Sequence, residues 1–182
     1  RDVERSRGLG DVYKRQYYSR RGENYVNGII KDLSIGNTET MANKIAVYLD
    51  VDIFRIETVS DYPEDYTETT NVAMLELNAN ARPKLKSSID NIGEYDMVFL
   101  GYPNWWGTMP MCVCTFLESY DFSGKTILPF CTHEGSGLGH SEKDIVKFCP
   151  DSDVKKGLAI RGSRVATADN EIAAWLNDNK LI

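Results

Sequence analysis

Residues 95–110 read YDMVFLGYPNWWGTMP, and this stretch decides the fold. Its first part, 95–101, is a nearly continuous apolar run, which is typical of a parallel strand buried on both faces. Its second part, 102–110, places two adjacent tryptophans, Trp105 and Trp106, directly after that strand. The stretch therefore predicts a parallel sheet covered by helices, with an aromatic loop at one edge.

The same alternation of strand and helix continues on both sides of this stretch. Further strands are predicted at 52–59, 126–131 and 154–160. Helices are predicted after Gly36, with Asn37 as its N-cap, at 67–80, at 110–118, from Ser141 to about 148 and around 168–176. Pro129 is awkward inside a strand because it removes a ladder donor. Strands separated by helices predict an α/β domain with helices on both faces of a parallel sheet. In such sheets ligands bind outside the carboxyl ends of the strands.

The composition is ordinary for one globular domain of 182 residues, with a formal net charge of −6. An acidic balance disfavours nucleic-acid binding, which needs a clustered basic face. No apolar run has the length of a membrane span, and no signal peptide is visible. The four cysteines contain no C-x-x-C pair, so we expect reduced core cysteines in a cytoplasmic protein.

The N-terminal end lacks the apolar run that a central first strand requires. Residues 10–16, GDVYKRQ, are too polar for a strand buried on both faces. We therefore expect residues 1–16 to be a non-native or disordered extension and residues 17–182 to form the domain.

The first of three loops that could carry chemistry ends in Gly36, Asn37 and Thr38 and opens a helix. Backbone N–H groups and the positive end of the helix dipole make such a start an anion site. The alternative is a plain helix cap.

The second loop, 103–108, follows the buried strand and contains both tryptophans. A flat apolar ring could stack on one indole, with Asn104 and Thr108 supplying polar edges. A buried aromatic plug or a surface for a partner protein is an equally good interpretation of this loop.

The third loop, 131–140, carries glycines at 135, 137 and 139, which allow close approach of a ligand to the backbone. Its GSGLG run is neither a dinucleotide fingerprint nor a hydrolase nucleophile elbow. A flexible loop is the alternative. Because all three loops follow strands of one sheet, we expect them to meet at one edge.

These motifs resemble the flavodoxin family, and in particular its bacterial subgroup with a WWGTMP stretch. The resemblance runs from about residue 17 to 182 and is most specific at 102–110, at 122–133 and at 135–139. It implies a flavodoxin-like three-layer sandwich whose five-stranded parallel sheet has the order 2-1-3-4-5. It also implies FMN as the cofactor.

The resemblance assigns roles to the three loops. The helix start would hold the FMN phosphate, the tryptophans would lie at the isoalloxazine ring, and residues 132–137 would line its pyrimidine side. The phosphate loop departs from the family pattern, because residues 20–35 are inserted between Ser19 and Gly36. Either Ser19 still reaches the phosphate, or Ser34 takes that role. The expected cofactor-binding residues are Ser19, Gly36, Asn37, Thr38, Pro103, Asn104, Trp105, Trp106, Gly107, Thr108, Thr132, His133, Gly135, Ser136 and Gly137.

Function follows as an expectation with open alternatives. The first is an electron-transfer protein that serves redox partner proteins or small quinone-type acceptors, with no catalytic side chain and no metal. The second is an NAD(P)H-dependent quinone or flavin reductase with bound FMN, and the third is a binding module that has lost FMN. Gly107 could let a peptide reorient when the flavin is protonated.

Overall fold

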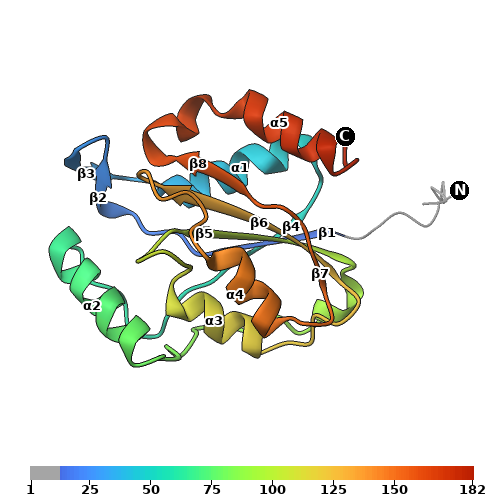
Figure 1. Ribbon diagram of the computed structural model, residues 1–182, viewed down its shortest axis with the longest axis horizontal. Helices are drawn as coiled ribbons and strands as arrows, with labels where there is room; N and C mark the ends of the chain where they lie inside the picture. The colour runs from blue at the N-terminus through green and yellow to red at the C-terminus, as the bar shows by residue number, and fades with distance from the viewer. Residues whose placement is uncertain (1–12) are drawn as a thin grey trace, which may run out of the picture.

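The computed structural model describes residues 13–182, which form a parallel sheet between two layers of helices (Figure 1). The strands of this sheet are β1 (Tyr13–Tyr17), β4 (Asp52–Arg55), β5 (Met97–Pro103), β6 (Thr126–His133), β7 (Asp153–Val154) and β8 (Leu158–Arg161). The helices are α1 (Asn37–Tyr48), α2 (Tyr66–Asn78), α3 (Met111–Glu118), α4 (Ser141–Phe148) and α5 (Asp169–Asp178). Short 3-10 helices cover Ile92–Glu94 and Gly162–Thr167. Within residues 13–182, no helix is long and apolar enough to cross a membrane.

The strand order is β4-β1-β5-β6-β7, with β8 pairing the other half of β6, and every pair is parallel. If β7 and β8 are counted as one interrupted fifth strand, this is the predicted order 2-1-3-4-5. The interruption also explains Pro129. Strand β7 pairs with residues 126–127 of β6 and β8 with 130–133, so Pro129 lies at the gap between them, where no partner requires its missing N–H.

The two faces of the sheet carry separate apolar cores. Met41 and Ile45 of α1 pack with Ile172 and Leu176 of α5 on one face. On the other face, α3 and α4 contribute a second cluster that includes Phe116 and Ile145. Strand β5 serves both cores, which explains why residues 95–101 are apolar almost throughout.

The domain is predicted to start at residue 17, and strand β1 begins four residues earlier, at Tyr13. Residues 13–16 belong to β1, the strand between β4 and β5, although Lys14, Arg15 and Gln16 are polar. Backbone pairing on both sides holds these residues in the sheet. Their polar side chains lack the apolar pattern from which a buried strand is predicted. The rest of the expected extension, 1–12, lies outside the described residues.

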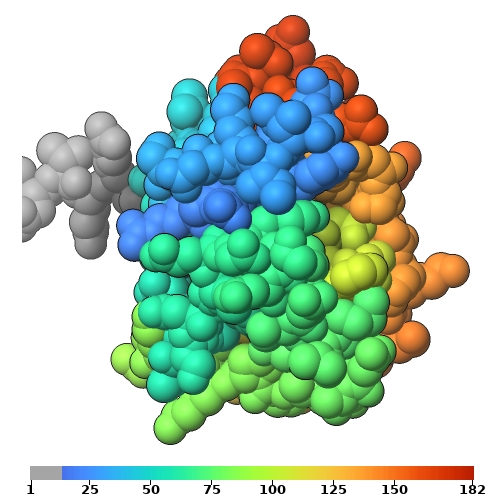
Figure 2. Space-filling model, turned by 90° about the vertical axis from the view of Figure 1, so that its left-hand side faces the viewer, coloured from blue at the N-terminus to red at the C-terminus, as the bar shows by residue number. Residues whose placement is uncertain are grey.

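The insertion between β1 and α1 is a separate antiparallel hairpin of β2 (Gly22–Val26) and β3 (Ile29–Leu33). Its tip, Asn27-Gly28, has positive φ at both residues, as a two-residue hairpin turn requires. The hairpin lies beside α2 at the carboxyl edge of the sheet (Figures 1 and 2).

Candidate functional site

The three loops do meet at one edge, where they line a cavity of about 940 Å³. This volume is within the range of about 300–1,000 Å³ that is usual for ligand pockets. The predicted residues that line the cavity are Ser19, Asn37, Thr38, Pro103, Asn104, Trp105, Trp106, Gly107, Thr132, His133, Gly135 and Ser136. Gly36, Thr108 and Gly137 do not line it. Each of these three instead supports a neighbouring residue of the site.

The start of α1 is built from two segments that the insertion separates in sequence. Asn37 is the first helical residue and not the N-cap, because Gly36 takes that position without a side-chain bond. Instead, the Ser19 hydroxyl at the end of β1 accepts a hydrogen bond from Glu39 N–H at 3.0 Å. Ser19 is therefore at the helix start, whereas Ser34 is not among the cavity residues.

Gly36 lets the chain return to the point where the insertion left it. A methyl group at this position would overlap Ser19 Oγ and lie 2.6 Å from the carbonyl oxygen of Arg20. The inserted residues therefore leave the fold and rejoin it at the same point. As a result, the first turn of α1 lies in space directly after the end of β1. Asn37 and Thr38 line the cavity, and their N–H groups belong to the first turn of α1, where a helix provides no acceptor of its own.

The first and third loops are joined by a hydrogen bond of 2.8 Å between the hydroxyls of Thr38 and Thr132. The second loop is joined to the third through Asn104, whose N–H donates to Thr132 O at 2.8 Å. The Asn104 side chain donates to Gly137 O at 2.8 Å and accepts from Gly107 N–H at 2.9 Å. Asn104 thus organises both loops, and Gly137 acts through its carbonyl.

The aromatic loop is a tight turn closed between Trp105 and Thr108, with Trp106 at φ 56° and Gly107 at φ 88°. The two tryptophans point to different surroundings. Trp105 packs edge-on against Tyr18 and Tyr62, with ring centroids 5.4 and 5.0 Å apart. Trp106 is 50% exposed and donates its indole N–H to Thr70 O at 3.0 Å. Trp105 is therefore the plug, and Trp106 offers a flat face that α2 holds in place.

The turn is braced from α4. His140 N–H donates to Gly107 O at 2.8 Å, and the Thr108 hydroxyl donates to Asp144 Oδ2 at 2.7 Å. The same carboxylate oxygen is 2.6 Å from His140 Nδ1. Burial alone would raise the pKa of the Asp144 carboxyl, but hydrogen bonds from Thr108, His140 and Lys147 outweigh it and lower the pKa.

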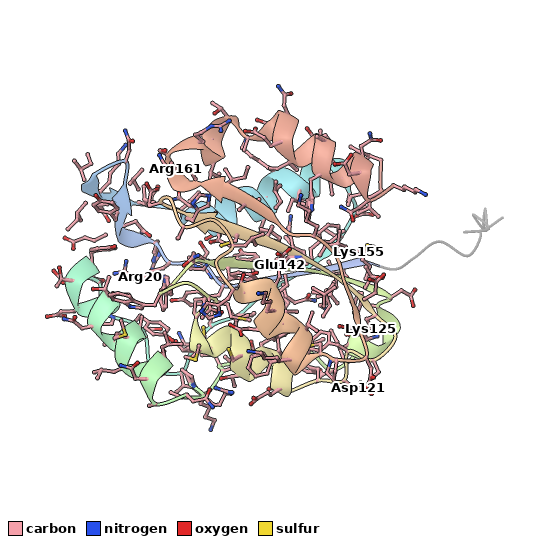
Figure 3. The ribbon with its side chains drawn as sticks, viewed as in Figure 1. Arg20, Asp121, Lys125, Glu142, Lys155 and Arg161 are labelled. Atoms are coloured by element: carbon pink, nitrogen blue, oxygen red, sulfur yellow. The ribbon has the colours of Figure 1, made fainter. Side chains whose placement is uncertain are left out.

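The third loop brings one histidine and one carboxylate to the cavity. Burial, and then the positive charge of Arg161, lower the pKa of His133, which favours the neutral imidazole, and its Nδ1 accepts from Gly135 N–H at 2.9 Å. Glu134 Oε2 accepts from Asn27 N–H at 3.0 Å and so ties the tip of the β2–β3 hairpin to this loop. Arg161 ends β8 on the same side of the molecule (Figure 3).

Sequence reasoning missed one wall of the cavity. The missed lining residues are Arg20, Asn24, Tyr25, Tyr66, Thr69, Thr70 and Ala73. Most belong to the hairpin or to α2, and neither of these segments is one of the three loops. The Asn-Gly pair at 27–28, between apolar residues, was a readable hairpin signal.

The four cysteines take no part in this site. Cys112, Cys114, Cys131 and Cys149 are free and buried, as predicted for reduced core residues. Burial raises the pKa of each thiol, to about 11 for Cys114 and Cys149, so none is a reactive thiolate at neutral pH. Among the residues described, no group of histidine, cysteine and acidic side chains could hold a metal ion.

A parallel sheet of this order, with a cavity at the carboxyl ends of its strands and a helix start facing that cavity, defines the mononucleotide-binding class of doubly wound α/β proteins. The sequence profile of the flavodoxin family matches residues 31–179. The chain therefore belongs to the flavodoxin family.

Solved structures agree with this assignment. A protein from Bacteroides eggerthii described as a flavoprotein shares 30% identity and a TM-score of 0.75 over 93% of this chain and 98% of that chain. A flavoprotein from Lactobacillus acidophilus, solved in complex with FMN, shares 20% identity and a TM-score of 0.62 over 91% and 99%. An NADH:FMN oxidoreductase in its apo form shares 13% and 0.54 over 92% and 85%. The last two are similar in fold alone. No curated protein sequence matches the chain.

Proposed function

We propose that this chain binds FMN at the three-loop cavity and transfers electrons through it. The observation that carries this proposal is the meeting of a helix start, an exposed indole and a glycine-rich loop around one cavity of about 940 Å³. Membership of the flavodoxin family and the FMN-bound structure from Lactobacillus acidophilus support the choice of ligand.

The phosphate end of the cavity fits a mononucleotide. The N–H groups of Asn37 and Thr38 and the Thr38 hydroxyl would hold phosphate oxygens at the positive end of α1. Ser19 would keep this first turn in shape through its bond to Glu39 N–H. The Glu39 carboxylate, which would repel a phosphate, is paired with Arg55 at 3.1 Å.

The ring end of the cavity fits a flat heterocycle. The exposed face of Trp106 offers a stacking surface, and the backbone of residues 132–136 offers polar groups for the pyrimidine edge. FMN supplies the redox chemistry when bound, and the protein positions the ring and sets its electrostatic surroundings. Because Gly107 has a left-handed φ of 88° and no side chain, its peptide could turn toward the ring.

Two versions of this function remain as candidates. The first version is an electron carrier of the flavodoxin type, which exchanges single electrons with partner proteins. The Gly107 turn favours this version. A reductase of small molecules needs space for a second ligand, and the additional wall of the cavity from the hairpin and α2 favours that version. We place the carrier first, as an electron-transfer protein with FMN.

Reduction of the FMN-loaded protein tests the proposal and separates the two versions. In anaerobic photoreduction we expect two separated one-electron stages in the flavin spectrum, and Gly107→Ala should shift the first of their potentials. Gly93→Ala, in an exposed 3-10 turn with nothing within 4 Å, is the matched control. Rapid oxidation of NADPH with an added quinone and a single two-electron stage would instead indicate the reductase. A protein whose spectrum shows no bound flavin would contradict both.

A further inference from the structure

Trp105, the packed tryptophan of the aromatic loop, begins a row of side chains that leads away from the cavity. Trp105 lines the cavity, and its ring packs edge-on against Tyr62 with centroids 5.0 Å apart. The Tyr62 hydroxyl donates to Glu76 Oε2 at 2.7 Å. Glu76 belongs to α2 and lines a second hollow, of about 500 Å³, which shares no lining residue with the three-loop cavity. The three side chains therefore form a continuous path between two separate hollows.

The hydrogen bond between Tyr62 and Glu76 is suited to moving a proton. Its length of 2.7 Å is typical of a hydroxyl that donates to a carboxylate. Burial, then Cys112 and the bond to Glu76, raise the pKa of Tyr62, so the phenol holds its proton at rest. Burial also raises the pKa of Glu76, which makes its carboxylate a stronger base. The phenol proton therefore has an acceptor already in place.

Two other groups beside Tyr62 do not offer such an acceptor. The Cys112 thiol interacts with Tyr62, but burial raises the pKa of this thiol, so it keeps its own proton. Tyr18 packs against both Trp105 and Tyr62, with ring centroids 5.4 and 5.8 Å apart. Among the residues described, no carboxylate accepts a hydrogen bond from the Tyr18 hydroxyl. Of the two tyrosines that pack on Trp105, Tyr62 is thus the one with a base for its proton.

Contact with Trp105 and a bound base are the two things that one-electron oxidation of a tyrosine requires. Indole and phenol rings in contact exchange single electrons, because the two rings are oxidised at similar potentials. A phenol that loses an electron becomes strongly acidic, so a base positioned at its hydroxyl makes the step easier. A tyrosine that only filled space in the core would need no carboxylate, and burying a carboxylate is unfavourable.

We propose that Tyr62 is a redox-active tyrosine that serves the cavity through Trp105. A one-electron oxidant held in the cavity takes an electron from Trp105, and Trp105 takes one from Tyr62. Tyr62 becomes a neutral radical as its hydroxyl proton passes to Glu76 Oε2, and the proton returns when the electron returns. A flavin ring excited by light is an oxidant of this class. The path itself needs no FMN, so this inference goes beyond the proposed function and is tested separately from it.

Pulse radiolysis of the purified chain, without added FMN, tests the path. Azidyl radicals take one electron from tryptophan, and the exposed Trp106 beside Trp105 offers an entry point. We expect the absorption of the tryptophan radical to decay as that of a tyrosyl radical rises, at a rate independent of protein concentration. Tyr62→Phe and Trp105→Phe, which each keep an aromatic ring, should abolish this step. Glu76→Gln should slow it at least roughly 10-fold, because the positioned base is lost.

Tyr18→Phe is the matched control, since it changes the other tyrosine that packs on Trp105 and removes no bond to a carboxylate. This variant should keep the step at the rate of the parent protein. In the parent, the step should be slower in D2O than in H2O, because the phenol proton moves with the electron, and this measurement needs no variant to fold. Absence of the step in the parent, an equal step in Tyr62→Phe, an equal rate in Glu76→Gln, or equal rates in the two solvents would overturn the proposal.

Discussion

At the residue scale, Gly36 matters because it has no side chain. The segment that enters the inserted hairpin passes so close to this helix start that a methyl group would not fit between them. The φ of −67° at Gly36 suits any residue, so the requirement is space and not backbone conformation. The atoms that a methyl would meet, Ser19 Oγ and the Arg20 carbonyl, belong to the segment that shapes the first turn of α1. A change here therefore acts directly on the phosphate end of the cavity.

We therefore predict that Gly36→Ala weakens FMN binding at least about 10-fold and lowers the free energy of unfolding by about 1–3 kcal/mol, because overpacking displaces Ser19. Flavin fluorescence and urea unfolding measure the two effects. Gly93→Ala is the matched control, since nothing lies within 4 Å of its added methyl. Normal FMN affinity in Gly36→Ala would show that the Ser19 contact does not shape the site.

Asp144 gives a prediction that depends on pH. Its carboxylate accepts from Thr108 and contacts His140, and its pKa is lowered from the ordinary 3.8 despite burial. A lowered folded-state pKa means that the stabilisation is complete above about 3.8 and is lost as the pH falls below it. Asp144→Asn should therefore lower the free energy of unfolding by about 1–3 kcal/mol at pH 7, and the deficit should shrink at pH 3.

Urea midpoints at pH 7 and pH 3 check this, with the exposed Asp90→Asn as control. A deficit that is the same at both values would exclude the carboxylate as its cause. Sequence reasoning could not find this brace, because Asp144 lies far along the chain from Thr108. The two tryptophans were equally undecided from sequence, since neighbours in a turn differ only by the packing around them.

At the element scale, β1 is the strand whose polar sequence does not indicate a strand inside the sheet. Arg15 and Gln16 are fully buried, one toward each core, and within residues 13–182 Arg15 bonds only the carbonyl of Ala42. Arg15 Nε and Nη2 and both polar atoms of the Gln16 side chain have no partner among the residues described. Burial lowers the pKa of Arg15, which shows the cost of its charge there. A polar sequence in a central strand is not predictable from periodicity, because only the neighbouring strands define the position.

Replacing these side chains with apolar ones should stabilise the protein. We predict that Arg15→Met and Gln16→Leu each raise the free energy of unfolding by about 1–3 kcal/mol, because buried polar atoms without partners are removed. Lys143→Met, at an exposed position of α4, should have little effect in the same urea titration. A loss of stability in both β1 variants would show that the two polar side chains are satisfied in the folded protein.

At the scale of the whole molecule, the fold class was predictable because the alternation of strands and helices leaves few topologies. The strand order came from the family resemblance, and the structure has it apart from the interruption between β7 and β8. The cavity was predictable only along the three loops, since each follows a strand of the sheet. The opposite wall depends on where the inserted hairpin packs, and local sequence does not determine that placement.

Because the proposed FMN site exists only when β1, α1, β5 and β6 are assembled, FMN should bind the folded state alone. We predict that FMN at 100 times its dissociation constant raises the free energy of unfolding by about 2.7 kcal/mol. Thermal melts with increasing FMN should therefore move to higher temperature, whereas riboflavin, which lacks the phosphate, should have a smaller effect. An equal shift with riboflavin would contradict the role of the α1 helix start.

The central claim is that FMN stacks on Trp106 at the three-loop cavity. Its most direct test is a titration of the purified chain with FMN, followed by loss of flavin fluorescence, for the parent protein and for Trp106→Ala and Trp175→Phe. Trp175, a buried residue of α5 that packs in the core on one face of the sheet, is the control. We expect one FMN per chain, affinity reduced at least about 10-fold in Trp106→Ala and unchanged affinity in Trp175→Phe. A chain that leaves FMN fluorescence unchanged, or a Trp106→Ala variant that binds as tightly as the parent, would contradict this claim.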